Sequence, residues 1–571
     1  MKKALKKLLI IALACSAALS CLILPASAVE ANPTIRVGLA YGTGTLSAAH
    51  LQNANGYGRG FRLGYFDGSY QFVQLATVST DNIAILKDKN IYYDASQAEK
   101  RFSSTLVAGQ TGVVGAYHLE LAGVYYSYEE AASNCIYDGC FPAYVNGAYR
   151  VRVGQYSSVD EANTAGISRQ FMNYTVVGDS STCYTVVDRY TAAVLFEFDN
   201  GGAGLGVMPD VTNAYDVQTW FAGFKYRGGF EYRRLSGGDI TVINYVTIDD
   251  YAKGILPYEM SADWPIEALK AQCLAAKSYT LCSIGKHRSS GFDLCNTTDC
   301  QVYRGCNSAN SNSDLAVNQT SGEYVLYNGQ PAQCFYYSSN GGASEDAGNV
   351  WNEDIPYLKG VVDNYETIDS SYSHTFTPTE LGWLFNASGY SNSGTIVQCY
   401  VSQKTAMGNV YAVTFVDSNG KTMTITKEAA RNLFYSNTLG NKKTSQRFDV
   451  ITNYADGSSS GGSDGGAIYV NGSASDITEF TGVYAIGSSG TAAIGSKTAY
   501  AISGSGTADA VSPSGGSAPS GGGTAVSFTV SGSGLGHNVG MSQWGAHAMA
   551  TAGYTYRDIL AFYYTGVTIG R

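Results

Sequence analysis

Two segments of the chain repeat one pattern, and this repeat constrains the fold more than any other feature. Their sequences are GAYHLELAGVYYSYEEAAS from Gly115 and GAYRVRVGQYSSVDEANTA from Gly147. Each copy begins with alternating apolar and polar residues, which predicts a half-buried strand, and continues into a turn and a helix. Ser158 and Glu161 have the spacing of a helix-capping box. With a further strand, YTVVG from Tyr174, the two units predict a small split α/β sandwich.

The rest of the chain is predicted to be rich in strands. Its 571 residues exceed what one hydrophobic core usually organises, so we expect several domains. The chain has 67 glycines and 44 tyrosines but only 14% charged residues, which favours turns and aromatic strands over charged surface helices. The predicted fold class is α+β, with a mixed, β-rich domain that carries a short helical segment, plus the small split βαβ-type domain.

The charge of the chain argues against a nucleic-acid partner. The formal net charge is -10 and the pI is near 5.2. Nucleic-acid binding draws most of its energy from lysine and arginine, so no nucleic acid is expected. A neutral or sugar-like ligand fits this composition better.

The first residues predict export. Lysines at positions 2, 3, 6 and 7 precede an apolar run over 8–24, and the small residues Ala26, Ser27 and Ala28 follow it. This order is typical of a signal peptide that is cleaved after residue 28. The alternative is a retained membrane anchor, because the apolar run is long enough to span a bilayer. In either case the rest of the chain is expected outside the cytoplasmic membrane.

Two further features concern a cysteine pair and a low-complexity stretch. Cys135 and Cys140 flank a short turn in CIYDGC, which favours a local disulfide, with two free thiols as the alternative.

Residues 454–524 are rich in glycine and serine. We expect them to form a flexible, disordered insertion that acts as a spacer.

The stretch ILPYEMSADWPIEALKAQCLAAKSYTL from Ile255 predicts two successive helices. Thr247 can cap the first, which we expect to end at Pro257 because proline disfavours helical geometry in the residue before it. The second helix is expected to begin near Pro265. Its predicted inward face consists of Ile266, Leu269, Cys273, Ala276 and Thr280.

Two glutamates in this stretch have different predicted roles. Glu267 lies in the first turn of the second helix, where a carboxylate interacts favourably with the helix dipole and needs no catalytic explanation. Glu259 lies in the elbow between the helices, beside Tyr258, Met260 and Trp264. An apolar pocket there would raise its pKa and let it donate a proton to a glycosidic oxygen. The alternative is a structural glutamate that accepts backbone N–H bonds.

A short segment carries residues typical of zinc ligands. They are His287, Cys295, Asp299 and Cys300. The alternative in an exported protein is a disulfide between Cys295 and Cys300, for which Cys306 would compete. Four protein ligands leave no open position, so zinc here would hold the loop rather than activate water.

The glycine-rich stretch GSGLGHNVGMSQWGA from Gly532 is a candidate wall of a sugar-binding cleft. Its glycines allow close approach of a backbone to a ligand, and His537 and Gln543 could bond a sugar or orient Glu259. The alternative is a tight turn with a structural histidine.

Aromatic and acidic residues elsewhere are further candidates for sugar contacts. Tyr336, Tyr337 and Trp351 could offer flat faces to a sugar, although aromatic residues in a β-rich body are more often core or cross-strand pairs. Tyr258, beside Glu259, is a further candidate for substrate binding. Glu345 and Glu353 are expected in a solvated loop.

The sequence from Asn244 to Leu281 resembles the signature of stage II sporulation protein D and its amidase-enhancer relatives. Three other stretches agree with this resemblance in the same order: GFDLCNTTDCQVYRG from Gly291, FYYSSNGGASEDAGNVWNEDIPYLKGV from Phe335, and GSGLGHNVGMSQWGAHAMATAGYTYRDILAFYYTGV from Gly532. The resemblance covers most of Tyr226 to Arg571 apart from the insertion.

This resemblance implies lytic cleavage of peptidoglycan between N-acetylmuramic acid and N-acetylglucosamine, on strands stripped of stem peptides. It implies that Glu259 is the catalytic acid and base. It also implies structural zinc for some relatives, which have THC where this chain has TDC from Thr298, so that Asp299 replaces a histidine. Relatives usually carry glycine where Asn538 stands, and asparagine tolerates the left-handed backbone well.

The repeat resembles the sporulation-related SPOR domain, on the motif YRVRVGQYSSVDEA from Tyr149. The resemblance implies binding to peptide-stripped glycan, and the alternative is a generic α/β spacer. The predicted organisation is then a signal peptide (1–28), an N-terminal β-rich segment (29–110), a SPOR-like domain (111–180), a catalytic domain (181–453 and 525–571) and the insertion (454–524).

The predicted function is that of a secreted lytic transglycosylase at the cell wall or the outer face of the cytoplasmic membrane, in sporulation or division. Its predicted partners are peptidoglycan glycan strands and a cell-wall amidase. The alternative is a non-enzymatic amidase enhancer that binds peptidoglycan, and a purely adhesive wall protein is a third hypothesis.

Overall fold

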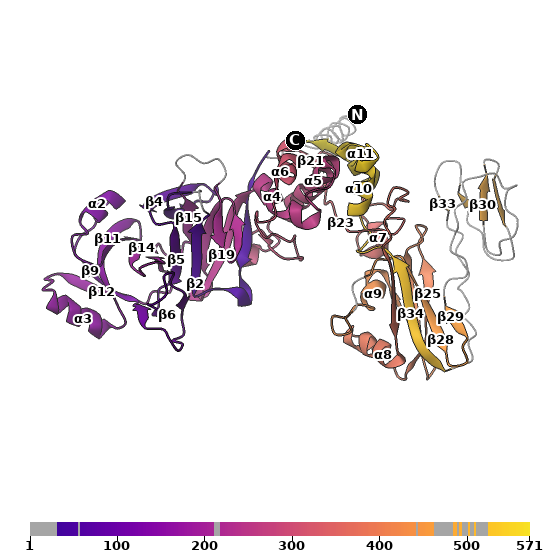
Figure 1. Ribbon diagram of the computed structural model, residues 1–571, viewed down its shortest axis with the longest axis horizontal. Helices are drawn as coiled ribbons and strands as arrows, with labels where there is room; N and C mark the ends of the chain where they lie inside the picture. Colours follow the sequence, from indigo (N-terminus) through magenta and orange to yellow (C-terminus); the bar gives the residue numbers. More distant parts are fainter. Residues whose placement is uncertain are drawn as a thin grey trace, which may run out of the picture. The chain divides into compact units, whose positions relative to one another are not determined.

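A computed structural model (Figure 1) describes residues 31–54, 58–210, 217–440, 444–461 and 524–571, with four short strands between 484 and 509. The predicted signal peptide and most of the predicted insertion lie outside these residues. The chain divides into two compact units, which we describe separately. The N-terminal unit comprises Val29–Asp263 and Thr280–Gly322, and the C-terminal unit comprises Trp264–Tyr279 and Glu323–Gly570. Among the described residues, no helix has both the length and the apolar character needed to cross a membrane.

A seven-stranded sheet in the N-terminal unit carries the first helix of the predicted pair. Its order is β20 (Leu294–Cys295), β1 (Thr34–Ala40), β19 (Ile240–Thr247), β18 (Gly229–Arg234), β15 (Leu205–Pro209), β3 (Phe61–Phe66) and β4 (Phe72–Val78). All pairs are antiparallel except β1 with β20. Strand β19 is buried along almost its whole length and runs directly into α4 (Ile248–Glu259), which packs against α6 (Ser311–Gln319).

The repeat forms one end of a ten-stranded sheet. The sheet order is β12 (Tyr174–Gly178), β9 (Tyr117–Leu121), β11 (Ala148–Tyr156), β10 (Cys140–Val145), β14 (Val194–Asp199), β13 (Tyr184–Asp188), β5 (Asn82–Lys87), β2 (Ala48–Asn53), β16 (Thr219–Phe221) and β17 (Phe224–Tyr226). A separate small sheet has the order β7 (Phe102–Ser103), β6 (Ile91–Tyr93), β8 (Gly112–Val114).

The two copies of the repeat fold as predicted. Along the chain they read β9, α2 (Tyr128–Ser133), β10, β11, α3 (Val159–Ser168) and β12, and their strands take the split βαββαβ order β12-β9-β11-β10. Ser158 accepts the Glu161 amide at the start of α3, and Ser127 accepts the Glu130 amide at the start of α2. Figure 1 shows α3 lying along this end of the sheet. The split α/β sandwich is therefore confirmed, but it shares its sheet with strands outside the repeat.

The C-terminal unit contains further sheets and most of the second helix of the predicted pair. One sheet has the order β24 (Ser371–Phe376), β34 (Ala525–Ser533), β28 (Phe448–Tyr454), β29 (Ser459–Gly461), and a second has the order β25 (Ile396–Lys404), β26 (Val410–Asp417), β27 (Thr422–Thr426). Two smaller sheets have the orders β22 (Gln330–Pro331), β21 (Tyr324–Tyr327), β36 (Thr568–Gly570) and β23 (Tyr336–Tyr337), β35 (Met541–Ser542). Its helices are α5 (Ile266–Ser283), whose last turn belongs to the N-terminal unit, α7 (Ala347–Val350), α8 (Pro378–Ala387), α9 (Lys427–Asn432), α10 (Gln543–Thr551) and α11 (Tyr556–Tyr563).

The predicted insertion connects two adjacent strands. Strands β28 and β34 are antiparallel neighbours, and Tyr454 is the register partner of Ala525. Side chains of these strands join those of β25, β26 and α8 in one apolar core that includes Phe385, Phe415 and Phe528. Within 484–509 the described strands are the pairs β30 (Tyr484–Gly487) with β31 (Gly490–Ala493), and β32 (Ala501–Ile502) with β33 (Ala508–Asp509).

The structure corrects two predictions about the helix pair. Helix α4 does not end at Pro257 but continues through it to Glu259. The proline removes its own i→i−4 hydrogen bond, and the helix continues for only two residues beyond it. Helix α5 begins at Ile266, close to the predicted start, but it is buried on nearly all sides, including Gln272 and Lys277, rather than on one face. A helix that is mostly apolar all round is typical of a protein interior.

The predicted disulfide of the repeat is not formed in the structure. Cys135 and Cys140 are free thiols. The described residues nevertheless confirm the predicted fold class of mixed α+β with a large share of strands.

Candidate functional site

Glu259 is the last residue of α4 and is half-buried. The Thr247 hydroxyl caps the start of this helix by accepting the Asp250 amide at 3.3 Å, as predicted. Gly254 lets the helix lie against the ring of Tyr303, since a methyl group there would come within 2.4 Å of that ring. The helix is therefore fixed on the sheet, and its C-terminal end holds Glu259 between the buried interior and solvent.

The neighbours predicted for Glu259 lie in different surroundings. Tyr258 is half-buried, and its hydroxyl donates to the Arg304 carbonyl at 3.4 Å. Met260 is buried. Trp264 belongs to the C-terminal unit, where its ring contacts the rings of Trp544 and His547, each at 4.7 Å between centroids.

Glu267 has the contacts of a structural residue. One carboxylate oxygen accepts Lys270 Nζ at 2.8 Å, and the other accepts the Tyr556 amide at the start of α11, also at 2.8 Å. These bonds fix the start of α5 to α11, in keeping with the non-catalytic role predicted for it.

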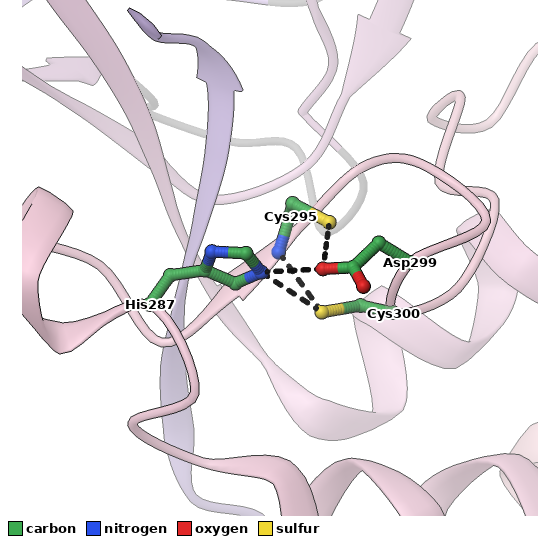
Figure 2. Close-up of side chains that lie close together, drawn as sticks. All are labelled: His287, Cys295, Asp299 and Cys300. Atoms are coloured by element: carbon green, nitrogen blue, oxygen red, sulfur yellow. Dashed lines mark hydrogen bonds and ion pairs between the residues drawn. The ribbon is translucent and has the colours of Figure 1, made fainter. Parts of the chain in front are cut away.

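The four predicted metal ligands converge on one point. Figure 2 shows His287, Cys295, Asp299 and Cys300 pointing toward one another, and their ligand atoms all lie within 4.8 Å of each other. His287 Nε2 lies 3.3 Å from Cys300 Sγ and 3.2 Å from Asp299 Oδ2, and Cys295 Sγ lies 3.9 Å from the same oxygen. We call these residues the cysteine cluster.

The chemistry of the cysteine cluster fits zinc. Tetrahedral zinc with bonds of about 2.0–2.3 Å places its ligand atoms about 3.3–3.8 Å apart, close to the separations observed. The backbone amide of Cys295 donates to Cys300 Sγ at 3.4 Å. Thr297 Oγ1 lies 3.2 Å from Cys295 Sγ. Such polar contacts at sulfur are typical of the surroundings of metal-bound thiolates.

Both cysteines of the cluster are free thiols, so the alternative disulfide is not formed. Burial raises the pKa of Cys300 to about 11. At Cys295 burial also acts to raise the pKa, but hydrogen bonds from Thr297, Cys300 and Tyr41 together lower it. Cys306 does not compete for either sulfur, because its own Sγ accepts a bond from Arg227 at 3.0 Å.

His537 lies in an aromatic cluster with Trp351 in the C-terminal unit. Its ring centroid is 5.1 Å from that of Trp351, 5.3 Å from Tyr337 and 6.2 Å from Phe335. His537 Nδ1 accepts the Val539 amide at 3.1 Å. Removal from water lowers the pKa of His537 to about 4, so the ring is neutral at physiological pH. Trp351 Nε1 donates to Glu428 at 3.0 Å.

The remaining residues of the glycine-rich stretch are tightly held. Asn538 adopts the expected left-handed backbone, with φ of 61°. Its side chain donates to the carbonyls of Asn340 and Ala343 and accepts the Gln446 amide, at 2.9–3.1 Å. Gln543 is the first residue of α10 and is 8% exposed. Glu259 and Tyr258 belong to the N-terminal unit, whereas Trp351, His537 and Gln543 belong to the C-terminal unit.

Glu345 is not in a solvated loop, which corrects the prediction. Its carboxylate is buried and accepts four hydrogen bonds, from Asp346, Asn349, Thr405 and Asn409. Burial raises its pKa although these bonds oppose the rise. Glu353 is exposed, as expected.

Sequence reasoning missed Tyr41 as a neighbour of the cysteine cluster. Burial raises the pKa of its hydroxyl, and the Cys295 sulfur raises it further. Strand β1 pairs in parallel with β20, with Gly38 opposite Cys295, and this pairing brings Tyr41 close. No local sequence signal links residues so far apart along the chain.

Residues 236–327, which hold Glu259 and the cysteine cluster, match the family model described as stage II sporulation protein. Over this segment the chain is similar to the stage II sporulation protein family. The matched segment begins just before β19 and ends with β21.

Known proteins with similar sequences include an amidase enhancer of Bacillus subtilis, 30% identical over 331 residues, 56% of this chain and 40% of that protein. Stage II sporulation protein D of Bacillus subtilis is 28% identical over 161 residues, 24% of this chain and 45% of that protein. An uncharacterized protein of Brachyspira hyodysenteriae is 43% identical over 121 residues, 21% of this chain and 33% of that protein. The chain thus spans a third to just under half of the length of these relatives.

Proposed function

We propose that this chain is an exported peptidoglycan lytic transglycosylase that acts on peptide-stripped glycan, with Glu259 as its catalytic acid and base. The observation that carries the proposal is the position of Glu259. It ends a firmly packed helix, remains partly exposed, and lies in the segment that matches the stage II sporulation protein family. A relative's name, stage II sporulation protein D, supports a role in sporulation.

The proposed reaction needs only one carboxyl group. Glu259 donates its proton to the glycosidic oxygen as the bond from that oxygen to the muramyl anomeric carbon breaks. The C6 hydroxyl of the same muramyl residue then attacks the anomeric carbon, and its proton passes to the Glu259 carboxylate. The product is a 1,6-anhydro ring, and the carboxyl group is restored. Ordinary glycosidases need a second carboxylate because water or the enzyme supplies the nucleophile.

The test is digestion of purified, peptide-free glycan by the full chain. We expect anhydro-muramyl ends from the wild type and at least a hundredfold fewer from Glu259→Gln, since general acid catalysis contributes about 10²- to 10⁴-fold. Glu267→Gln is the matched control, because Glu267 lies nearby in sequence but bonds α11. It should retain activity. Undiminished activity of Glu259→Gln would refute the catalytic role.

The second candidate function is non-enzymatic enhancement of a cell-wall amidase. It is favoured by the similarity over 56% of the chain to a protein named amidase enhancer. The same digestion assay separates the two candidates. An enhancer produces no anhydro ends by itself and increases stem-peptide removal only when an amidase is present.

We assign the glycan contacts to the residues that the sequence predicted to bind substrate. Tyr258 and Trp351 are half-buried residues, and we assign their rings to contacts with sugar. Gln543 is assigned a hydrogen bond to sugar, and His537 a positioning role within its aromatic cluster, since its Nδ1 is already bonded. The SPOR-like repeat is proposed to bind peptide-stripped glycan. The cysteine cluster is proposed to bind structural zinc, which when present would hold the loop after α5.

A further inference from the structure

A second cluster of charged side chains is buried in the ten-stranded sheet, away from the cysteine cluster. It consists of Asp88, just after β5, His118 on β9 and Glu197 on β14, and we call it the buried triad. These residues are 2%, 0% and 0% exposed, respectively. One carboxylate or imidazole atom of each lies within 4.8 Å of those of the other two.

The triad forms because the sheet curls. His118 Nε2 lies 2.9 Å from Glu197 Oε1, although β11 and β10 separate their two strands in the sheet. Leu119 and Val153 pack with Ala162 of α3. Since side chains alternate along strands, His118 points to the opposite face of the sheet from Leu119. Its contact with Glu197 across two intervening strands means that this face is concave.

The hydrogen bond of the other ring nitrogen fixes how His118 faces the triad. His118 Nδ1 lies 2.6 Å from the Gly154 carbonyl oxygen. A carbonyl only accepts, so Nδ1 carries the hydrogen. Gly154 lies at a bulge in β11 with φ of 76°, where a side chain would strike the ring of Tyr156. In neutral His118, Nε2 would then present a lone pair to the Glu197 carboxylate, so either a proton on Nε2 or a metal cation must lie between them.

The charges of the cluster also call for a cation. Glu197 Oε2 accepts Arg152 at 2.8 Å, and Arg152 is shared with Glu120. The buried carboxylates of Asp88 and Glu197 together with Arg152 leave one negative charge, which a metal cation or a proton on His118 can balance.

Asp88 supplies the independent observation that points to a ligand. Its Oδ2 accepts the Ser180 amide at 2.8 Å, but its Oδ1 has no hydrogen-bond partner although the residue is buried. A buried carboxylate oxygen without a partner is costly.

We propose that Asp88 Oδ1, His118 Nε2 and Glu197 Oε1 bind one divalent transition-metal cation, with zinc as the best fit. One imidazole and two carboxylates are a common donor set for such ions, and the second nitrogen of the histidine is held by a backbone carbonyl, as metal-bound histidines usually are. The ion would tie β9 to β14 and to the end of β5, which makes it a structural ion of the curled sheet.

The test uses the full chain with Cys295→Ser and Cys300→Ser, which removes the thiolates of the cysteine cluster. Elemental analysis after purification without chelator should give one zinc per chain. Reconstitution of the metal-free protein with Co²⁺ should give visible d–d bands without thiolate-to-metal charge transfer, since the triad has no sulfur ligand. Adding Asp88→Asn or His118→Gln should weaken Co²⁺ binding at least tenfold. Glu120→Gln is the matched control, because Glu120 contacts Arg152 but does not belong to the triad, and it should bind Co²⁺ normally.

Two results would overturn the proposal. One is a folded Cys295→Ser, Cys300→Ser chain, judged by circular dichroism, that binds neither zinc nor Co²⁺; the triad would then hold a proton on His118 instead. The other is metal binding that Asp88→Asn and His118→Gln both leave unchanged. If either triad variant fails to fold, the metal content of the Cys295→Ser, Cys300→Ser chain still tests the proposal. None of these measurements depends on glycan cleavage, so they are independent of the proposed function.

Discussion

At the scale of single residues, the polar side chains of the glycine-rich stretch from Gly532 are used mainly to hold the backbone in place. Asn538 adopts a backbone conformation that most residues avoid, and its amide ties three separate backbone groups together. His537 is held beside it by aromatic rings and the Val539 amide. A motif that resembles a binding loop in sequence is therefore largely committed to its own packing.

The lowered pKa of His537 predicts a pH dependence of stability. Its folded pKa is about 4, against about 6.5 in an unfolded chain. The unfolded state binds more protons between these values, so the contribution is complete above about pH 6.5 and is lost as the pH falls toward 4. We expect the free energy of unfolding of the wild type to fall by about 2–3 kcal/mol more than that of His537→Gln between pH 7 and 4. Urea unfolding at several pH values measures these free energies. An equal fall with pH in the wild type and in His537→Gln would contradict the prediction.

At the scale of elements, the seating of α4 depends on one glycine. A methyl group on Gly254 would come within 2.4 Å of the ring of Tyr303, which is itself bonded to Asn244 on β19 at 2.8 Å. We expect Gly254→Ala to cost about 1–3 kcal/mol, although alanine favours helices by about 1 kcal/mol. Gly382→Ala in α8 is the control, since no atom lies within 4 Å of the added methyl group. This control substitution should stabilise the protein. Thermal melts in which both substitutions raise the melting temperature equally would rule out the clash with Tyr303.

At the scale of the whole molecule, the repeat shares its sheet with strands that lie outside it. Strand β10 pairs in parallel with β14, with Ala143 opposite Glu197, and Arg152 bonds the same glutamate. A fragment of residues 111–180 lacks β14, so it would expose the edge of β10 and leave Arg152 without this buried partner. We expect the fragment to melt without a cooperative transition, whereas the full chain unfolds cooperatively. Circular dichroism melts test this, and a sharp transition of the fragment would disprove it.

The parts of the structure that could be predicted from sequence are those set by neighbours along the chain. The strands and capped helices of the repeat follow from local periodicity and from Ser158 with Glu161, and the cysteine cluster follows from residues close in sequence. The continuation of α4 through Pro257 was missed, because its tolerance depends on where the helix ends. The approach of Asp88 to His118 was also missed, because it depends on the curl of a sheet whose strands are distant in sequence.

The pairing of Tyr454 with Ala525 has a consequence for how this chain can diverge. After β28 the chain continues into β29, which pairs with one side of β28, and it returns at β34 on the other side of β28, so both ends of the stretch between residues 461 and 525 are anchored in one sheet. Strand β34 then leads into the segment that carries His537 and Gln543. Related chains could therefore lengthen, shorten or replace this stretch by a complete extra domain without altering a single strand pair of the core.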